Sequence, residues 1–258
     1  MERVRILTFN IAHGRGLNPI QGLTTKVRLC RNLKKISELI VNLRPDIVAL
    51  QEIDQRSRWA GNFDQLDYLR EHTGYPYSVF GINTRREGLL NLAYGNGLLS
   101  RHPIVASDTI TFGQRSLGEK GFIFAEVNIH GHLVPIVNLH LHYRSRTHRF
   151  RQLDLLLAFL REKRRAHGGQ WPVLPIVCGD FNTPGGSSAD VTAALHRHLN
   201  DLADYTRHPR EGRTFPSPLP TRLLDFIFLP PRAEEPRCEV VRCFLSDHRP
   251  VLVDFTLA

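Results

Sequence analysis

Long hydrophobic segments are absent from this sequence of 258 residues. The longest purely apolar run in a helical context covers residues 155–160, far fewer than the roughly 20 residues that span a bilayer. Residues 1–9 carry charges, but no long apolar stretch or small-residue cleavage site follows them, so they read as a first strand and not as a secretory signal. We therefore expect neither a transmembrane helix nor export, and we expect a cytoplasmic location.

Cysteine is also scarce, and no C-x-x-C pair occurs among Cys30, Cys178, Cys238 and Cys243. In a chain without an export signal, such widely spaced cysteines are expected to be reduced thiols, not disulfides or zinc ligands. The sequence has no internal repeat, low-complexity tract or domain linker. With 41% hydrophobic and 23% charged residues, the whole chain, 1–258, is predicted to form a single globular domain.

Acidic residues are outnumbered, because 34 Lys and Arg accompany 25 Asp and Glu and give a formal net charge of +9. The basic residues concentrate at 26–35 and at 144–165, and the second segment holds eight Lys or Arg but two acidic residues. A basic face favours polyanionic partners such as nucleic acid or an anionic membrane surface. The alternative is an ordinary solvated helix face. No feature of the sequence indicates an obligate protein partner.

Hydrophobic periodicity predicts alternating strands and helices. Apolar residues at steps of three and four predict a helix over 29–43, ended by Pro45, and further helices are predicted at 63–72, 150–160 and 191–199. Strands are predicted at 4–9, 47–50, 77–82, 94–99, 104–112, 122–129, 133–141, 173–178, 223–229, 239–245 and 251–257. Pro135 and Pro175 fall inside two of these runs, so those strands should lie at edges, or begin or bulge there. This pattern predicts an α/β sandwich of two packed sheets flanked by helices.

Polar side chains adjoin many of the predicted strands at their ends. They are Asn10, Glu52, His140, Asp180, Asn182, Asp225, Asp247 and His248. An ionised group beside an apolar run is costly unless it is paired or bound to a metal. Taken singly, such residues are often turn residues, helix caps or satisfied core residues. Their common position at strand ends indicates instead that they form one polar site.

The motifs that contain these residues resemble those of the endonuclease/exonuclease/phosphatase superfamily. They are Thr-Phe-Asn (8–10), Leu-Gln-Glu (50–52), Asn-Leu-His-Leu (138–141), Gly-Asp-Phe-Asn (179–182), Leu-Asp-Phe-Ile-Phe (224–228) and Ser-Asp-His (246–248), in the order of that family. The stretches 94–101 and 214–216 are similar to those of its bacterial members. The resemblance implies a four-layer α/β sandwich, with two mostly antiparallel sheets between helices, and a metal-dependent phosphoric ester hydrolase.

A catalyst for phosphodiester hydrolysis must neutralise charge, and the hard cations Mg²⁺ or Mn²⁺, bound by carboxylate and amide oxygens, suit this task. Glu52 and Asn10 are expected to hold the cation, as the resemblance also implies. Asp247 is expected to join them directly or through water.

The other polar residues have expected roles around the phosphate. Asp180 is expected to polarise the attacking water, with Asn182 holding that water or a phosphoryl oxygen. His248 would donate to phosphate oxygens, and Asp225 would fix its tautomer and keep it protonated. His140 would bind phosphate or protonate the leaving group. The substrate contacts that we expect are Asn182, His140, His13, Asn96 and Arg144.

The sequence departs from the abasic-site repair branch of the family. It has Ile53 and Asp54 after Glu52 in place of Thr-Lys, Ala12 in place of Asp, and a His at 140. These residues resemble the branch of DNase I-like nucleases, sphingomyelinase-like phosphodiesterases and deadenylases. A small-molecule or lipid head-group phosphodiester is favoured as substrate. The alternatives are a nuclease acting on DNA or RNA and an inactive phosphate-binding module. Residues 82–92 would supply apolar contacts to a lipid, or form a packed hairpin.

Overall fold

Two six-stranded β-sheets form the centre of the computed structural model, which describes residues 3–88, 91–113, 118–183 and 190–258. The first sheet has the strand order β11-β12-β1-β2-β4-β3. Its strands are β1 (Arg3–Asn10), β2 (Ile47–Asp54), β3 (Tyr77–Arg86), β4 (Leu92–Ser100), β11 (Ala233–Val240) and β12 (Val251–Leu257). β1 and β2 are parallel, and the other neighbouring strands are antiparallel.

The second sheet has the order β5-β6-β7-β8-β10-β9. Its strands are β5 (Ile104–Thr111), β6 (Gly121–Ile129), β7 (His132–His140), β8 (Ile176–Asp180), β9 (Thr206–His208) and β10 (Asp225–Leu229). Here β7 and β8 are the parallel pair. Both parallel pairs lie near the middle of their sheets, so the carboxyl ends of β1, β2, β7 and β8 determine which residues meet between the sheets.

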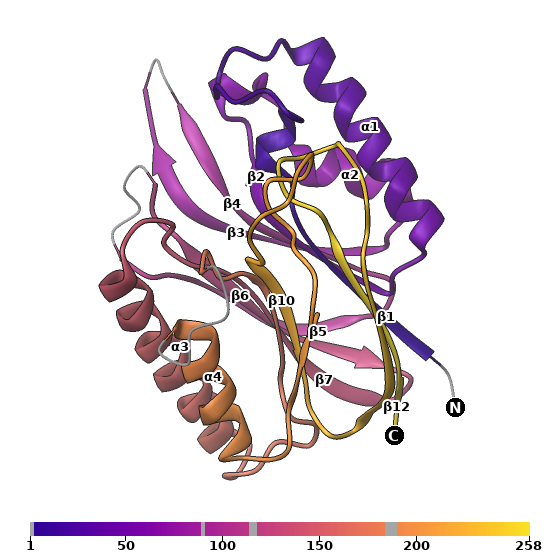
Figure 1. The fold of residues 1–258 in the computed structure, drawn as a ribbon, viewed down its shortest axis with the longest axis vertical. Helices are drawn as coiled ribbons and strands as arrows, with labels where there is room; N and C mark the ends of the chain where they lie inside the picture. Colours follow the sequence, from indigo (N-terminus) through magenta and orange to yellow (C-terminus); the bar gives the residue numbers. More distant parts are fainter. Residues whose placement is uncertain (1–2, 89–90, 114–117, 184–189) are drawn as a thin grey trace.

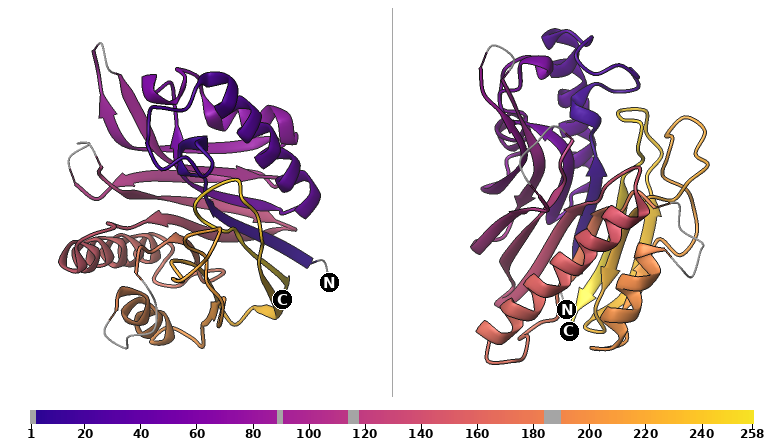
Figure 2. Two further views of the ribbon diagram at one scale, coloured as in Figure 1. Left: turned by 45° about the horizontal axis from the view of Figure 1, so that its top comes forward. Right: turned by 90° about the vertical axis from the view of Figure 1, so that its left-hand side faces the viewer.

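Helices cover the outer face of each sheet. α1 (Lys26–Leu43) and α2 (Gln65–Thr73) pack on the first sheet, and α3 (Arg146–Ala166) and α4 (Val191–Asn200) pack on the second (Figures 1 and 2). Two short 3-10 helices, η1 (Ala12–Gly14) and η2 (Arg58–Ala60), follow β1 and β2. The arrangement is helices, sheet, sheet, helices, which confirms the predicted four-layer α/β sandwich.

Alternation along the strands separates two kinds of core. Val4 and Ile6 of β1 belong to the core between the sheets, and Leu7 and Phe9 belong to the core under α1 and α2. This two-residue period is the one expected for strands covered on both faces. A third core, rich in phenylalanine, joins the second sheet to α3 and α4.

Two of the predictions about strands can be compared in detail. The predicted strand at 239–245 is wrong, because the strand is β11 (Ala233–Val240) and residues 241–250 form a loop. The prediction for Pro175 is confirmed, since β8 begins one residue after it. The prediction for Pro135 is wrong: β7 lies in the middle of its sheet, begins at His132 and pairs with β6 through Pro135, and its pairing with β8 starts only at Ile136. The segment 82–92 belongs to the β3–β4 hairpin, with Leu92 buried; Leu89 and Leu90 lie outside the described residues.

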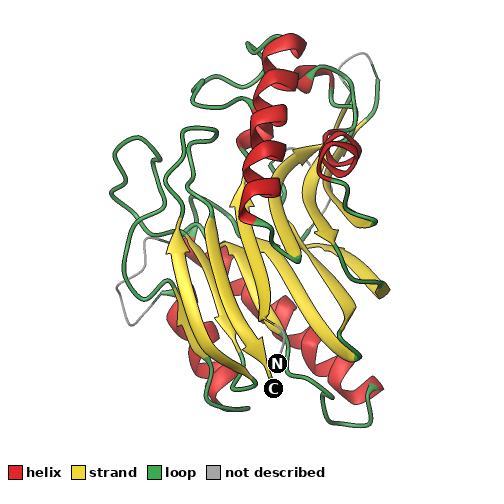
Figure 3. Ribbon diagram, turned by 90° about the vertical axis from the view of Figure 1, so that its right-hand side faces the viewer, coloured by secondary structure: helices red, strands yellow, loops and turns green. Residues whose placement is uncertain are grey.

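Both ends of the chain lie at one end of the sandwich. Arg3 pairs with Thr256, and the long loops gather at the opposite end, as Figure 3 shows. Within the described residues, none of the helices has the length and apolar content that crossing a bilayer requires. The four cysteines are free thiols, as predicted.

Candidate active site

Strand alternation brings four of the predicted polar residues together between the sheets. Asn10 continues the inner face of β1, and His140, Asp180 and Asp225 continue the inner faces of β7, β8 and β10. Asp180 and Asp225 are paired directly across the β8–β10 ladder. Asn10 Nδ2 donates to Asp180 Oδ2 at 3.0 Å, which joins the two sheets at this point.

Glu52 reaches the same place through a β-bulge. In β2, Ile47 and Ala49 face inward and Val48 and Leu50 outward, so regular alternation would turn Glu52 outward. The register shifts between Gln51 and Ile53, and Glu52 has a φ of 52°. Its Oε1 consequently lies 4.0 Å from His140 Nε2 of the other sheet. A positive φ at a non-glycine residue is strained backbone of the kind that often accompanies functional sites.

His248 is held by a buried carboxylate. Its Nδ1 lies 2.9 Å and 3.2 Å from the two oxygens of Asp225, and its Nε2 lies 3.7 Å from Asp180 Oδ2. Burial alone would lower the pKa of His248, but the carboxylates of Asp225 and Asp180 outweigh it and raise the pKa to about 10. At neutral pH the imidazole is therefore a cation with an Nε2–H directed into the cluster.

Asp180 is the most centrally placed acid. Its Oδ1 accepts a hydrogen bond from the backbone N–H of Asn182 at 2.8 Å, and its Oδ2 accepts the bond from Asn10. Burial raises the pKa of Asp180 to about 7; the nearby Asp225 charge adds to this effect and His248 opposes it. A carboxylate with a pKa near neutrality is suited to accepting a proton from water.

His140 lies between an amide and an ammonium group. Its Nε2 is 3.0 Å from Asn182 Nδ2 and its Nδ1 is 3.4 Å from Lys120 Nζ. Burial and the Lys120 charge lower the pKa of His140 well below its ordinary value, so the ring is neutral. Lys120 is 7% exposed, and its Nζ also lies 3.4 Å from Glu52 Oε1.

The other oxygen of Glu52 faces His13. His13 Nε2 lies 3.6 Å from Glu52 Oε2, and its Nδ1 lies 2.7 Å from Asp54 Oδ2. Trp59 Nε1 donates to the second oxygen of Asp54 at 2.8 Å, and the rings of Trp59 and Tyr94 flank His13. Burial opposes a charge on His13, but Asp54 and Glu52 raise its pKa. Burial also opposes the charge of Glu52, but Lys120 and the histidines lower its pKa.

The oxygen donors of the cluster suit a hard divalent cation. Glu52 supplies a partly exposed carboxylate, Asn10 an amide oxygen, and Asp247 a second partly exposed carboxylate, which pairs with Arg15 Nη2 at 2.7 Å. Ligand atoms of Asp180, Asp225 and His248 also lie within 4.8 Å of one another. The protonated His248 has no free lone pair, so the oxygen donors Glu52, Asn10 and Asp247 are the residues that could hold a divalent cation.

Two of the predicted substrate contacts, Asn96 and Arg144, have other partners in the structure. Asn96 is fully buried, and its Nδ2 donates to the main-chain oxygens of Gly121 and Asn138 at 2.9 Å and 3.3 Å. These bonds join the two sheets, so Asn96 has a structural role here, and its contact with substrate stays a prediction. Arg144 is exposed in the loop after β7, where its guanidinium lies 5.0 Å from the centre of the Tyr143 ring. Its backbone N–H donates to His142 Nδ1 at 3.2 Å, and its contact with substrate stays a prediction.

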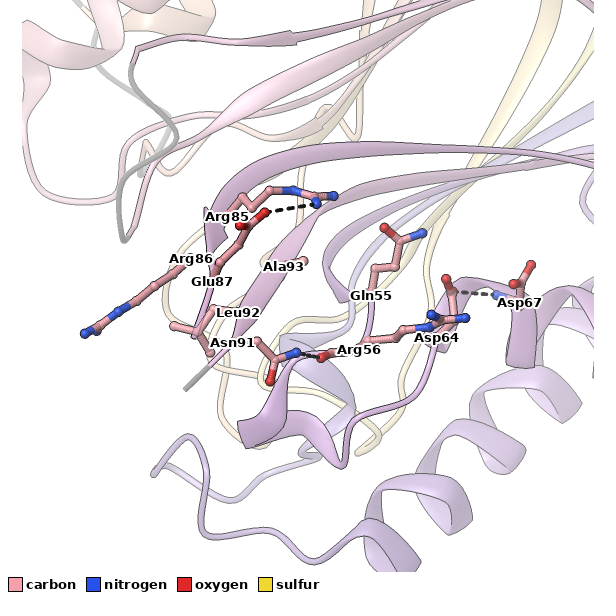
Figure 4. A pocket seen from close by; sticks show the side chains of 10 residues that line it. All are labelled: Gln55, Arg56, Asp64, Asp67, Arg85, Arg86, Glu87, Asn91, Leu92 and Ala93. Atoms are coloured by element: carbon pink, nitrogen blue, oxygen red, sulfur yellow. Dashed lines mark hydrogen bonds and ion pairs between the residues drawn. The ribbon is translucent and has the colours of Figure 1, made fainter. Parts of the chain in front are cut away.

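The described residues line several cavities outside the catalytic cluster, and two of them have volumes above 400 Å³ and lie near segments that the sequence singled out. One, of about 520 Å³, lies beside the β3–β4 hairpin, where Arg56, Arg85 and Arg86 are balanced by Asp64, Asp67 and Glu87 (Figure 4). The other, of about 440 Å³, is lined by Glu119 and His142 among other residues. In the sequence these two residues lie next to or near Lys120 and His140 of the cluster. The volume of this cavity is typical of small-molecule sites.

Sequence reasoning missed Lys120 and Asp54. Lys120 directly precedes β6 (Gly121–Ile129), so the strand-end criterion that selected Asp225 would also have selected it. Asp54 ends β2 two residues after Glu52. In the sequence it marks only a departure from a family pattern, but in the structure its carboxylate lies 2.7 Å from His13 Nδ1 and raises the pKa of that histidine.

Comparison with known proteins agrees with this geometry. Residues 7–248 match the model of the endonuclease/exonuclease/phosphatase family. A search of curated protein sequences gives no match. Among solved structures, an endonuclease/exonuclease/phosphatase from Beutenbergia cavernae is similar with a TM-score of 0.73 and 20% identity, over 100% of this chain and 72% of that chain.

Two further structures share the fold. Truncated TDP2 from Caenorhabditis elegans has a TM-score of 0.64 and 19% identity, over 99% of this chain and 98% of that one. A mannosyl-6-phosphatase from Bacteroides thetaiotaomicron has a TM-score of 0.67 and 16% identity, over 98% and 100% of the two chains. At these identities the similarity establishes the shared architecture alone.

Proposed function

The chain belongs to the endonuclease/exonuclease/phosphatase family, whose members are phosphoric ester hydrolases, and from this premise we propose that it hydrolyses a phosphodiester with the help of Mg²⁺ or Mn²⁺. The observation that carries the proposal is the meeting of Glu52, Asp180 and His248 between the sheets. An inactive phosphate-binding module would not need all three of these residues.

In the proposed mechanism Glu52 would hold the cation, with the oxygens of Asn10 and Asp247 as further ligands. When bound, a divalent cation neutralises phosphate charge and stabilises the leaving oxygen. Lys120 and His13, on the two sides of Glu52, keep that carboxylate ionised and oriented.

Asp180 would accept the proton of the attacking water. Its pKa of about 7 allows it to be ionised at neutral pH and still basic enough to take a proton. Asn182, whose backbone N–H fixes Asp180 Oδ1, would hold the same water or a phosphoryl oxygen with its side-chain amide.

His248 would donate its Nε2–H to the non-bridging phosphate oxygens, with its orientation and charge set by Asp225. His140 is neutral, so it would act as a hydrogen-bonding group toward phosphate and not as a cationic acid. Lys120, next to His140, would add a positive charge on the side of the leaving group.

A small-molecule or lipid head-group phosphodiester is the favoured substrate. The cavity of about 440 Å³ beside Glu119 and His142 has a volume suited to the part of such a substrate that does not react. One protein of the same fold is a mannosyl-6-phosphatase, which acts on a small phosphate ester. A nuclease is the second candidate, supported by the exposed arginines of α3 (Arg151, Arg161, Arg164 and Arg165).

Hydrolysis of bis(p-nitrophenyl) phosphate with Mg²⁺ or Mn²⁺, with and without EDTA, tests the reaction class. We expect the chelator to abolish turnover and added metal to restore it. Asp180→Asn should lower kcat by roughly 10²–10⁴-fold, whereas the matched control His198→Ala, at an exposed position on α4, should leave it unchanged. Turnover that survives EDTA, or a fully active Asp180→Asn variant, would overturn the proposal.

The substrate class is tested by comparing plasmid nicking with the release of head groups from sphingomyelin or phosphatidylinositol. Head-group release without nicking supports the favoured substrate. Efficient nicking at low salt, with no lipid product, would support the nuclease instead.

A further inference from the structure

Large hydrophobic side chains are exposed on loops at the end of the sandwich that carries the candidate active site, and on the first turn of α1. We call this set the apolar rim: Leu17, Ile20, Leu23, Val27, Tyr143, Leu219 and Phe244. Their exposure is high for apolar residues, with Leu219 at 80%, Val27 at 69% and Leu23 at 66%. Exposed hydrophobic residues that gather around a site, and are not scattered singly, indicate an interaction surface.

Chain topology explains why these residues share one end of the molecule. The loop 11–25 follows β1 and the loop 141–145 follows β7, both at the carboxyl ends that carry Asn10 and His140. The loops 209–224 and 241–250 precede β10 and β12, which run antiparallel to β8 and β1 and therefore start at the same end. In the right-hand view of Figure 2 the loops near residues 20, 220 and 245 lie on one side of the upper end.

Cationic side chains are interleaved with the apolar rim. Arg144 lies over the Tyr143 ring at 5.0 Å, and Arg242 lies over the Phe244 ring at 5.8 Å. Lys26 and Arg28 flank Val27, and Arg222 is exposed close to Leu219. Apolar side chains that protrude beside arginines are the combination by which peripheral proteins bind anionic lipid surfaces.

We propose that the apolar rim docks on the surface of an anionic phospholipid bilayer, so that the end of the sandwich with the candidate active site faces the head groups. The purpose of docking, which is to bring the enzyme to a lipid substrate, rests on the proposed function. Binding to the bilayer does not, because it needs no turnover. Anionic lipid fits better than nucleic acid, because Leu219, Leu23 and Ile20 are aliphatic and cannot stack on bases as aromatic residues do. The formal charge of +9 adds a general attraction to an anionic surface.

Sedimentation with phosphatidylcholine vesicles, with and without phosphatidylserine, tests the proposal on the full chain carrying Asp180→Asn, so that no lipid is consumed. We expect binding that depends on phosphatidylserine. The double variant Leu219→Ser with Phe244→Ser should lower the partition coefficient at least tenfold. The matched control Val105→Ser alters a residue that is also exposed, at 62%, but lies on β5 at the far end, and it should bind as well as the parent.

Several results would overturn docking: no binding to phosphatidylserine vesicles at low salt, equal binding by the double variant and its parent, or preferential binding to a DNA duplex in fluorescence anisotropy. The circular dichroism spectrum and the melting temperature check that the double variant is folded. Hydrolysis of soluble bis(p-nitrophenyl) phosphate by the wild type is measured in parallel. Turnover without vesicle binding would contradict the docking proposal but not the proposed function. Vesicle binding without turnover would contradict the proposed function but not the docking proposal.

Discussion

The imidazole of His248 has carboxylates near both of its nitrogens, so its charge state depends on its neighbours as much as on pH. The pKa of about 10 for His248 and about 7 for Asp180 define opposite limbs of a pH profile. Asp180 must lose its proton to act as a base, so kcat/KM should rise as pH passes about 7. His248 must keep its proton to donate, so kcat/KM should fall as pH approaches about 10.

Asp225→Asn provides the test of this assignment. An amide at this position keeps a polar partner for His248 but removes the negative charge that raises its pKa. The alkaline limb of the kcat/KM profile should move to lower pH. The acid limb should still report the deprotonation of Asp180. A profile measured with soluble substrate in which the alkaline limb does not move would show that His248 is not the group responsible.

Lys120 competes with any cation for Glu52, because its Nζ lies 3.4 Å from Glu52 Oε1 in a largely buried position. Lys120→Met should therefore lower kcat/KM by roughly 10²-fold and yet tighten Mn²⁺ binding by about tenfold, since an opposing charge has been removed. Isothermal titration calorimetry measures the second effect. Lys34→Met, at an exposed position on α1, is the control. Unchanged Mn²⁺ affinity in Lys120→Met would contradict the competition.

At the scale of elements, the close approach of β7 and β8 depends on Gly179. Its φ is 137°, and a Cβ atom there would lie 1.9 Å from the main-chain oxygen of Leu139. Gly179→Ala should therefore lower the free energy of unfolding by roughly 3 kcal/mol or more, because it combines backbone strain with overpacking. Gly74→Ala is the control: φ is also positive there, at 73°, but no atom lies within 4 Å, and about 1 kcal/mol is expected. Denaturant unfolding curves measure both, and equal losses would contradict the packing argument.

The sequence predicted most of the strands and much of the candidate site because both depend on a two-residue period, but it did not predict β9 (Thr206–His208) or the position of β11. Asn10, His140 and Asp180 end strands and Asp225 begins one. The inner residues of these strands are apolar, so the direction of the four side chains could be extrapolated. Glu52 could not be placed in this way, because its inward direction depends on a bulge that reverses the alternation. Its position in a recognisable motif identified it instead.

The position of the edge strand β11 was not predicted correctly from the sequence. β11 contains Pro236 and several charged residues that disfavour a strand, although such residues are common at sheet edges, where they prevent further pairing. The more apolar residues 241–245 were predicted as the strand, but they form a loop in which the Val241 N–H donates to the Pro250 oxygen at 2.9 Å. Local composition therefore indicated the wrong segment.

At the scale of the whole molecule, the site depends on how the two sheets are placed against each other. Buried amide side chains that hydrogen-bond from one sheet to the other hold them in this position. Asn138 Nδ2 donates to the main-chain oxygens of Leu50 and Gly97 at 2.9 Å and 2.8 Å, and its Oδ1 accepts from Gln51 Nε2 at 2.7 Å. Asn138→Ala should lower the free energy of unfolding by roughly 1–3 kcal/mol for the buried groups left without partners. Guanidinium unfolding measures it, and a stability equal to the wild type would contradict this role.

The pairing of Arg3 with Thr256, at the end of the sandwich away from the long loops, has a practical consequence. A tag or surface tether attached to either terminus would hold the molecule with its candidate active site directed away from the support. Immobilised in this way, the protein could meet a vesicle, an oligonucleotide or a soluble ester with the same freedom, and the three could be compared on one sensor surface.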